Sequence, residues 1–497
     1  MTESDRDPAM PEGRLWEFAE KCAARNAVVN ACLAHGEMSL DEFLERQAEK
    51  VRKNLAVCPL RNPADFIETS VSMTEKRLGK TAAADVRDAL RCGVILTADH
   101  YGGIYCAQTF QGDILYAELL RRLGYAGRHI PILGGAQVEL GNVTFARGIC
   151  VYTEADGKNF LPMFGGKYRN MIALRAPSLT KNEIDRFRSE CIRLVSAPRM
   201  RDALNAICSD VYETDEVLSA PDYCSQITRL GVRLSEQLFP EDGSPVFTYL
   251  EIEEAILPIL IGELREEGSL LRHLLSDPAA RAQFASVKTG EGAPLISYLF
   301  GATDEKGRKV FLQPDEDGFL SGTTMDGGRL CFPFEPDAVS DLLEQRVLFP
   351  LLYAAVFLLT FERGITMTGG MFQALYLPDW HRCTVALLED LALSETAERI
   401  RNLDCSGYLC GPMSALCACG DYAVPAGPAE MWMLGTGFPE IRRLISATGL
   451  WNAHLVGLAE MYYDLFHKNE REENWYRTIG ESLYRNCRRN ILYDESA

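Results

Sequence analysis

The 497-residue sequence lacks the short motifs that identify several large enzyme classes. It contains no phosphate-binding Gly-x4-Gly-Lys-Ser/Thr loop and no Gly-x-Gly-x-x-Gly segment after a predicted strand. A His-Glu-x-x-His zinc motif and a Gly-x-Ser-x-Gly nucleophile turn are also absent. These absences disfavour the familiar NTPases, dehydrogenases, zinc peptidases and α/β-hydrolases.

Basic residues are scarce relative to acidic ones. The chain has 51 Lys and Arg against 70 Asp and Glu, a formal net charge of −19. An acidic surface repels nucleic-acid phosphates and anionic lipids. We therefore expect a small-molecule ligand, and neither nucleic acid nor a membrane as a partner. The oligomeric state stays open, with a homo-oligomer among the alternatives.

Long apolar runs are missing as well. The most apolar stretch, Val347 to Thr360, is shorter than the roughly 20 residues that span a bilayer, and it contains Pro350, so it predicts buried core. Met1 to Gly13 is polar and acidic, without the apolar segment of a signal peptide. The 16 cysteines are scattered and suit buried thiols better than disulfides. These features predict a cytoplasmic protein.

The rest of the composition is that of an ordinary globular protein. Hydrophobic residues make up 47% of the chain and charged residues 24%. The length predicts two to four domains of about 150 residues each. Capping boxes at Ser39–Glu42 and Thr180–Glu183 predict that helices begin there.

One βαβ unit can be predicted between Gly93 and Arg169. An apolar strand at 93–98 is followed by a glycine-containing loop at 99–103 and a helix from Thr109 to Leu123. A second strand, 129–133, precedes another glycine loop, 134–142. A strand, a helix and a strand in this order predict two parallel neighbours joined by a right-handed crossover.

The predicted fold class is α/β, with a Rossmann-like parallel sheet core, a helical insert and helical N- and C-terminal regions. Residues 149–152 and a turn at 156–157 predict a hairpin, and Val246 to Leu250 is one short apolar run within the insert. The expected parts are an N-terminal tail with helices (1–90), the first part of the core (91–197), the helical insert (198–288), the second part of the core (289–390) and a C-terminal helical region (391–497).

The loop after the first predicted strand is the leading candidate site. In open α/β sheets, ligands bind beyond the carboxyl ends of the strands. His100 can act as an acid or base near neutral pH, and Asp99 could orient it or bind a hydroxyl. Gly102 and Gly103 would let a ligand approach the backbone, and the following helix N-terminus favours an anionic group. The alternative is a turn in which Asp99 and His100 only cap the helix.

Two further loops offer candidate ligand-binding residues. The loop after the second strand should lie beside the first and carries Gln137, Glu139 and Asn142. A later segment places Gly369, Gly370 and Gln373 just after an apolar run, where close backbone approach to a ligand is expected. Each loop is also explained by an ordinary turn.

Four cysteines gather near the C-terminal region, with the spacing Cys-x4-Cys-x6-Cys-x-Cys: Cys405, Cys410, Cys417 and Cys419. Four thiolates can bind zinc or an iron–sulfur cluster, but the usual Cys-x2-Cys pairs are missing. Buried thiols are the favoured interpretation, and no metal ligand is assigned.

The segments Gly93–Gly103 and His129–Leu133 resemble the opening of the Rossmann-like domain of bacillithiol synthase, a cysteine-adding enzyme family. The resemblance continues in order to about residue 385, through the segments 237–243, 298–300, 306–309, 318–319 and 365–376. It implies the architecture and a pocket at the strand ends. Asp99-His100 replaces the Gln-Gln of the family's first loop, and its acidic His-Asp cluster and its C-terminal coiled coil have no counterpart. Cysteine addition is therefore not carried over.

The sequence thus predicts a cytoplasmic enzyme that binds a small polar metabolite at strand-end loops. The resemblance implies a ligase- or transferase-like reaction, with a nucleotide or an amino acid as the second ligand. The alternatives are a non-catalytic ligand-binding or assembly protein with a Rossmann-like fold, and a metalloprotein built on the four cysteines. No cofactor can be named.

Overall fold

The centre of the molecule is a four-stranded parallel sheet. The computed structural model describes residues 13–34, 38–101, 104–142, 148–153, 157–315 and 317–492. The sheet has the order β12-β1-β2-β5, with all neighbouring strands parallel. Its strands are β1 (Val94–Leu96), β2 (His129–Gly134), β5 (Val246–Glu251) and β12 (Thr366–Thr368). The carboxyl ends of all four strands therefore lie at one edge.

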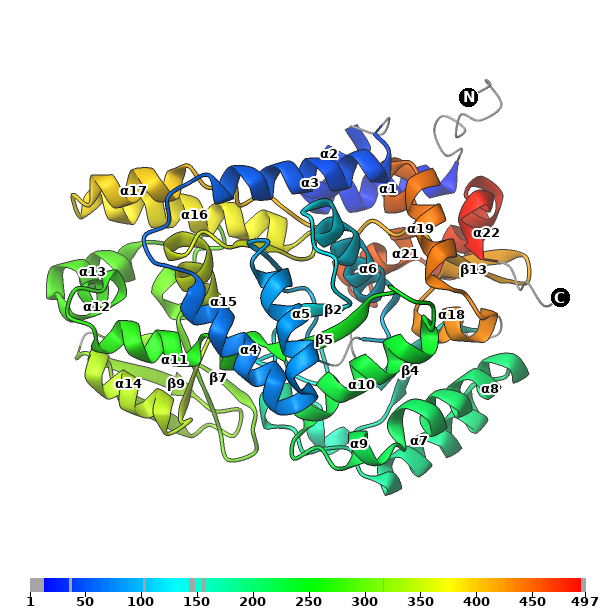
Figure 1. Ribbon diagram of the computed structural model, residues 1–497, viewed down its shortest axis with the longest axis horizontal. Helices are drawn as coiled ribbons and strands as arrows, with labels where there is room; N and C mark the ends of the chain where they lie inside the picture. Colours follow the sequence, from blue (N-terminus) through cyan, green and yellow to red (C-terminus); the bar gives the residue numbers. More distant parts are fainter. Residues whose placement is uncertain are drawn as a thin grey trace.

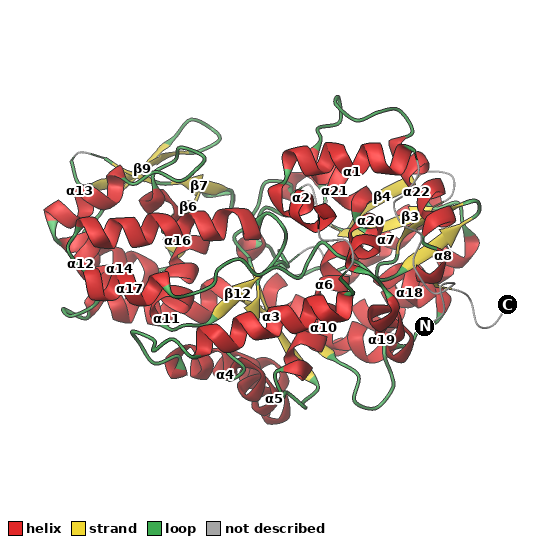
Figure 2. Cartoon of the chain, turned by 90° about the horizontal axis from the view of Figure 1, so that it is seen from above, coloured by secondary structure: helices red, strands yellow, loops and turns green. Residues whose placement is uncertain are grey.

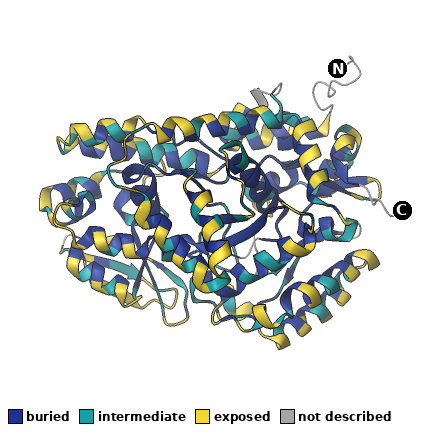
Figure 3. Cartoon of the chain, viewed as in Figure 1, coloured by how far each residue is buried: buried dark blue, intermediate teal, exposed yellow. Residues whose placement is uncertain are grey.

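Helices cover both faces of this sheet. Along β1, Val94 and Leu96 pack into one core and Ile95 into the other, because successive side chains of a strand point to opposite faces. The first core includes α6 (Ala107–Arg122) and α10 (Tyr223–Leu238). The second includes α4 (Ala64–Leu78), α5 (Lys80–Leu90) and α11 (Ile252–Arg265). Figures 1 and 3 show the buried strands between helices whose outward faces are exposed.

Two groups of elements extend from the sheet on either side of its carboxyl edge (Figure 2). One contains the sheet β11-β6-β7 (Leu348–Pro350, Phe300–Thr303, Lys309–Phe311), the sheet β10-β9-β8 (Arg329–Pro333, Phe319–Thr323, Gln313–Pro314), α12 (Leu270–Ser276), α13 (Pro278–Ser286), α14 (Pro336–Glu344), α16 (Gln373–Asp390) and α17 (Ser394–Arg401). The other contains α1 (Arg14–Arg25), α2 (Ala27–Ala34), β3 (Gly148–Thr153), β4 (Gly157–Pro162), α7 (Lys181–Leu194), α8 (Pro198–Ile207), α18 (Pro428–Leu434), α20 (Leu450–Val456), α21 (Leu458–Leu465) and α22 (Trp475–Asn486).

Several predicted elements are confirmed. β1, α6 and β2 form the predicted parallel βαβ unit, and β3 pairs antiparallel with β4 as a hairpin whose turn lies outside the described residues. Both capping boxes are present, at the starts of α3 (Leu40–Leu55) and α7. The predicted helical insert, 198–288, differs in one respect: its apolar run is β5, which joins the central sheet beside β2.

The apolar stretch 347–360 is buried core, as predicted. It contains β11, the short helix α15 (Leu352–Ala355) and the first part of a π-helical turn, Val356–Glu362. Within the described ranges, no helix combines the length and the apolar character needed to cross a bilayer.

Candidate functional site

A cavity of about 460 Å³ lies at the carboxyl edge of the central sheet. All four strands contribute to its lining: Thr97 and His100 follow β1, Gln137 follows β2, Ile252 follows β5 and Gly370 follows β12. Its volume lies within the roughly 300–1,000 Å³ typical of small-molecule sites. The cavity is therefore where the strand-end rule predicts a ligand.

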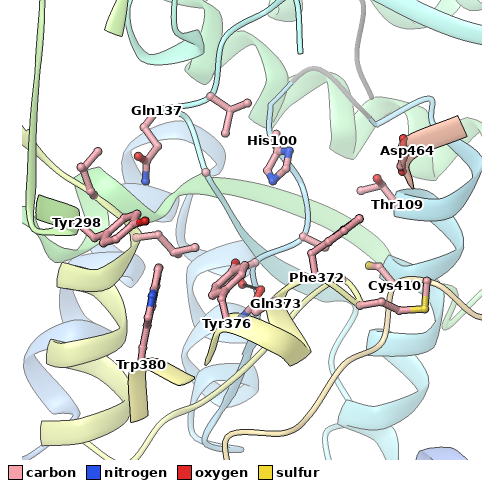
Figure 4. Close-up of a pocket in the computed structure, with 18 of the residues that line it drawn as sticks. His100, Thr109, Gln137, Tyr298, Phe372, Gln373, Tyr376, Trp380, Cys410 and Asp464 are labelled. Carbon is pink, nitrogen blue, oxygen red and sulfur yellow. Dashed lines mark hydrogen bonds between the residues drawn. The ribbon is translucent and has the colours of Figure 1, made fainter. Parts of the chain in front are cut away.

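Both groups of elements beside the sheet complete the walls. One contributes Tyr298, Lys309, Phe311, Tyr376 and Trp380, and the other contributes Asn26, Met461, Asp464 and Leu465. In Figure 4, His100 and Gln137 point into the cavity between an aromatic end, with Tyr298, Tyr376 and Trp380, and an opposite end with Thr109, Cys410 and Asp464. A bound molecule would contact segments that are far apart in the sequence.

Three long helices begin at this cavity. The first residues of α11 and α16, Ile252 and Gln373, line it, as do Gln108 and Thr109 in the first turn of α6. The N-terminus of a helix carries unpaired backbone N–H groups and a partial positive charge. The cavity therefore favours an anionic group.

His100 and Lys309 are the basic side chains that line the cavity. Burial, with a smaller effect of the Lys309 cation, lowers the pKa of His100 to about 4. Burial lowers the pKa of Lys309 to about 8, although Glu253 and Glu139 act to raise it. At pH 7, His100 is thus a neutral imidazole beside an ammonium group. It can accept a proton, and Lys309 can bind an anion.

The loop after β2 is held by a buried carboxylate. Glu253, which is 1% exposed, accepts hydrogen bonds from the backbone N–H groups of Ala136 (3.0 Å) and Gln137 (3.1 Å). Burial raises its pKa to about 7, against the effect of these hydrogen bonds. Lys309 in turn donates from Nζ to Gln137 Oε1 at 2.8 Å. These contacts fix the amide of Gln137 beside the lysine.

The loop after β12 depends on a glycine. A Cβ atom on Gly369 would lie 1.8 Å from Oε1 of Gln373, so only glycine leaves room for this amide. Gln373 Oε1 accepts a 2.8 Å hydrogen bond from the Thr97 hydroxyl, which ties the loop to the end of β1. Gly369 itself does not line the cavity, whereas its neighbour Gly370 does.

Asp99 does not line the cavity. It is fully buried, and its Oδ1 accepts a hydrogen bond from the backbone N–H of Tyr101 at 2.6 Å. Burial raises its pKa to about 7. Burial and Asp99 together raise that of Asp113, whose Oδ2 accepts from the Tyr249 hydroxyl. The structure thus pairs Asp99 with a second buried carboxyl group and leaves it out of the cavity.

The alternative role for Asp99 and His100 is a turn in which they cap the next helix. The N-cap residue of α6 is Cys106, whose side chain makes no capping hydrogen bond, and the Asp99 carboxylate instead closes a turn at the N–H of Tyr101. Glu139 forms an isolated bridge with Ile172 and, like Asn142, does not line the cavity. Gly102 and Gly103 lie outside the described residues.

The four clustered cysteines do not gather at one point, although the side chains of Cys417 and Cys419 interact with each other. Cys405 packs in the second core, whereas Cys410 and Cys417 pack in the first. Burial raises the pKa of Cys410 well above its usual value, so its thiol stays protonated. Among the residues that the structure describes, no three His, Cys, Asp or Glu side chains are placed to hold a metal ion.

Comparisons with known proteins identify no relative of this chain. No family model matches the sequence, and no significant match appears among curated proteins or solved structures.

Sequence reasoning missed Lys309 and the aromatic end of the cavity. Tyr376 and Trp380 are four residues apart on α16, a spacing that places both on one helix face. This spacing can be read from the sequence, but aromatic residues at helical spacing more often belong to the hydrophobic core than to a ligand site. Lys309 lies on a strand outside the central sheet, so the strand-end rule could not find it.

Proposed function

We propose that the chain is an enzyme that binds a small anionic metabolite at the carboxyl edge of a Rossmann-like core and modifies or joins it. The observation that carries this proposal is the cavity, which is lined by residues that follow all four strands and by a half-buried cation, Lys309. The metabolite's anionic group would face Lys309 and the helix N-termini. His100 would be the general base, because its imidazole is neutral at pH 7.

The proposed class of reaction is supported by a different observation. A ligase- or transferase-like reaction is supported by the resemblance to the bacillithiol synthase family, not by the cavity. A cytoplasmic setting is part of this proposal, because the described cysteines form no disulfide.

A ligand-binding or assembly protein without catalysis is the second candidate. The position of Asp99 favours it, because the expected partner of His100 does not line the cavity. The two candidates differ in what they predict for His100, since a binding protein needs no proton acceptor.

The test compares two histidines that lie at opposite edges of the central sheet. A thermal-shift screen of the wild-type protein against sugar phosphates, nucleotides and amino acids identifies ligands, and mass spectrometry detects products from pairs of them. In the enzyme, His100→Ala keeps the thermal shift and lowers turnover by about 10²-fold or more. His129→Ala is the matched control, because His129 begins β2 at the opposite edge. Unchanged turnover in His100→Ala would contradict the catalytic role, and ligands that bind without any product would favour the binding protein.

A further inference from the structure

The aromatic end of the cavity is a rigid platform. Trp380, which is 6% exposed, contacts Tyr376 at 4.7 Å and Tyr298 at 5.4 Å between ring centroids. A third ring, Tyr353, packs edge-on against Trp380 from the buried core. Figure 4 shows Tyr298, Tyr376 and Trp380 gathered on one side of the cavity. Rings held in this way offer a flat ligand a surface that need not reorganise.

Buried polar atoms without partners lie at the same end. Nε2 of Gln373 and Oγ1 of Thr289 have no hydrogen-bond partner among the residues the structure describes, and both residues line the cavity. Gln373 is one turn before Tyr376 on α16, and Thr289 precedes Gly290, whose N–H donates to Asp379 beside Trp380. An unpaired buried polar atom is costly. A ligand ring with polar atoms on its edge would satisfy both.

The cation of the cavity is close to this platform in the fold. Tyr298 precedes β6, and β6 pairs with β7, which carries Lys309 and Phe311. In this pairing Gly301 lies opposite Phe311, and Thr303 opposite Lys309. One ligand can therefore place a ring on the aromatic platform and an anionic group at the lysine.

We propose that the anionic metabolite of the proposed function is a nucleotide, with its base on Trp380 and its phosphate at Lys309. An aromatic amino acid also joins a ring to an anion. An indole or phenol ring, however, has one polar atom at most, whereas a nucleobase edge carries several donors and acceptors. The two unpaired atoms, Gln373 Nε2 and Thr289 Oγ1, favour the base.

Calorimetric titrations with adenosine 5′-monophosphate, adenosine, inorganic phosphate and tryptophan test this assignment. The wild-type protein is expected to bind the nucleotide at least tenfold more tightly than adenosine. Trp380→Leu should lower the affinity for both the nucleotide and adenosine by about tenfold or more, because base–aromatic stacking is lost. Lys309→Met should lower the affinity for the nucleotide to that for adenosine and leave the affinity for adenosine unchanged. Trp432→Leu is the control, since Trp432 lies in α18, outside the cavity lining.

Three results would overturn the nucleotide assignment. They are tryptophan binding in place of the nucleotide, nucleotide binding that Trp380→Leu does not change, and no nucleotide binding at all. If phosphate still binds through Lys309 and turnover still depends on His100, the proposed function survives these failures. Should Trp380→Leu not fold, Tyr298→Leu replaces it, because Tyr298 is only half-buried.

Discussion

The position of Lys309 costs the fold stability. Its ammonium group is partly desolvated, and its pKa falls from 10.5 to about 8. A charged form that folding disfavours destabilises the native state wherever the lysine is protonated in both states, which is below about pH 8. We therefore expect Lys309→Met to raise the stability at pH 7, by up to about 3 kcal/mol. The same substitution would abolish binding of the anionic ligand, since residues of functional sites commonly lower the stability of the fold.

The stability gained by Lys309→Met should depend on pH. Between pH 8 and pH 10.5 the unfolded chain binds more protons at this lysine than the folded chain does, so the deficit shrinks as pH rises. Melting temperatures from pH 6 to pH 10 should show the gain of Lys309→Met fading over this window. Lys306→Met is the control, because Lys306 is 67% exposed on the same hairpin. An equal change in both variants would contradict the argument.

Some residues of the cavity could be predicted, and the reason is topological. His100, Gln137 and Gly370 follow strands of a parallel sheet, and parallel strands bring their carboxyl ends to one edge. Asp99 follows the same strand but does not line the cavity, because its carboxyl group is buried and accepts a hydrogen bond from the backbone N–H of Tyr101. Lys309 and Trp380 reach the cavity through long-range packing, which local sequence patterns do not encode.

Two helices show how packing reverses the effect of one substitution. Gly112 lies within α6 and Gly262 within α11. In the interior of a helix, alanine is favoured over glycine by about 1 kcal/mol. A Cβ on Gly112 would lie 2.0 Å from Sγ of Cys410 and 3.2 Å from its Cα, whereas nothing lies within 4 Å of a Cβ on Gly262. We expect Gly262→Ala to stabilise the protein and Gly112→Ala to destabilise it by about 1–3 kcal/mol.

Thermal melting of the two variants checks this pair. Adding Cys410→Ala to Gly112→Ala should recover part of the loss, because the sulfur is removed while the backbone contact remains. If Gly112→Ala were as stable as Gly262→Ala, α6 would be free to move away from the loop that carries Cys410.

The elements themselves were predictable where the local signal was strong. Capping boxes gave the starts of α3 and α7, and a short apolar run before Gly134 gave β2. β5 was recognised only as an apolar run within a helical region, because its fully buried pattern has no alternation to identify a strand. Its place beside β2 is a long-range pairing.

At the scale of the whole molecule, the N-terminal helices belong to the central core. The expected N-terminal part, 1–90, includes α4 and α5, and both pack in the second core with strands of the central sheet. A cluster of ion pairs connects α4 to the central part of the fold. Arg363, just after the turn that precedes β12, binds Asp65 of α4 at 2.6 Å and Glu263 of α11 at 2.9 Å. Three segments distant in the sequence therefore meet at one guanidinium group.

Removing that cation should weaken the whole fold. The side chains of Arg363 and Glu263 are 3% and 4% exposed, and Glu362 is buried beside them, where burial and Glu263 raise its pKa to about 8. Arg363→Met removes the buried cation of these carboxyl groups and leaves Glu263 only its 3.3 Å pair with Arg61. Breaking a buried pair costs about 3–5 kcal/mol. Arg265→Met is the control, since Arg265 is 44% exposed in its pairs with Asp341 and Glu344 and should matter little.

Acid should partly rescue the Arg363→Met variant. Arg363 lowers the pKa of the buried Glu362 carboxyl, so without this cation that pKa rises, and lowering the pH protonates the carboxyl and removes the buried charge. The folded state then binds more protons than the unfolded state, and the deficit relative to the wild-type protein becomes smaller on going from pH 8 to pH 5. Melting temperatures at both values measure this. A deficit that is the same at pH 5 and pH 8 would mean that Arg363 stabilises by packing its alkyl chain between α4 and α11, with its charge contributing nothing.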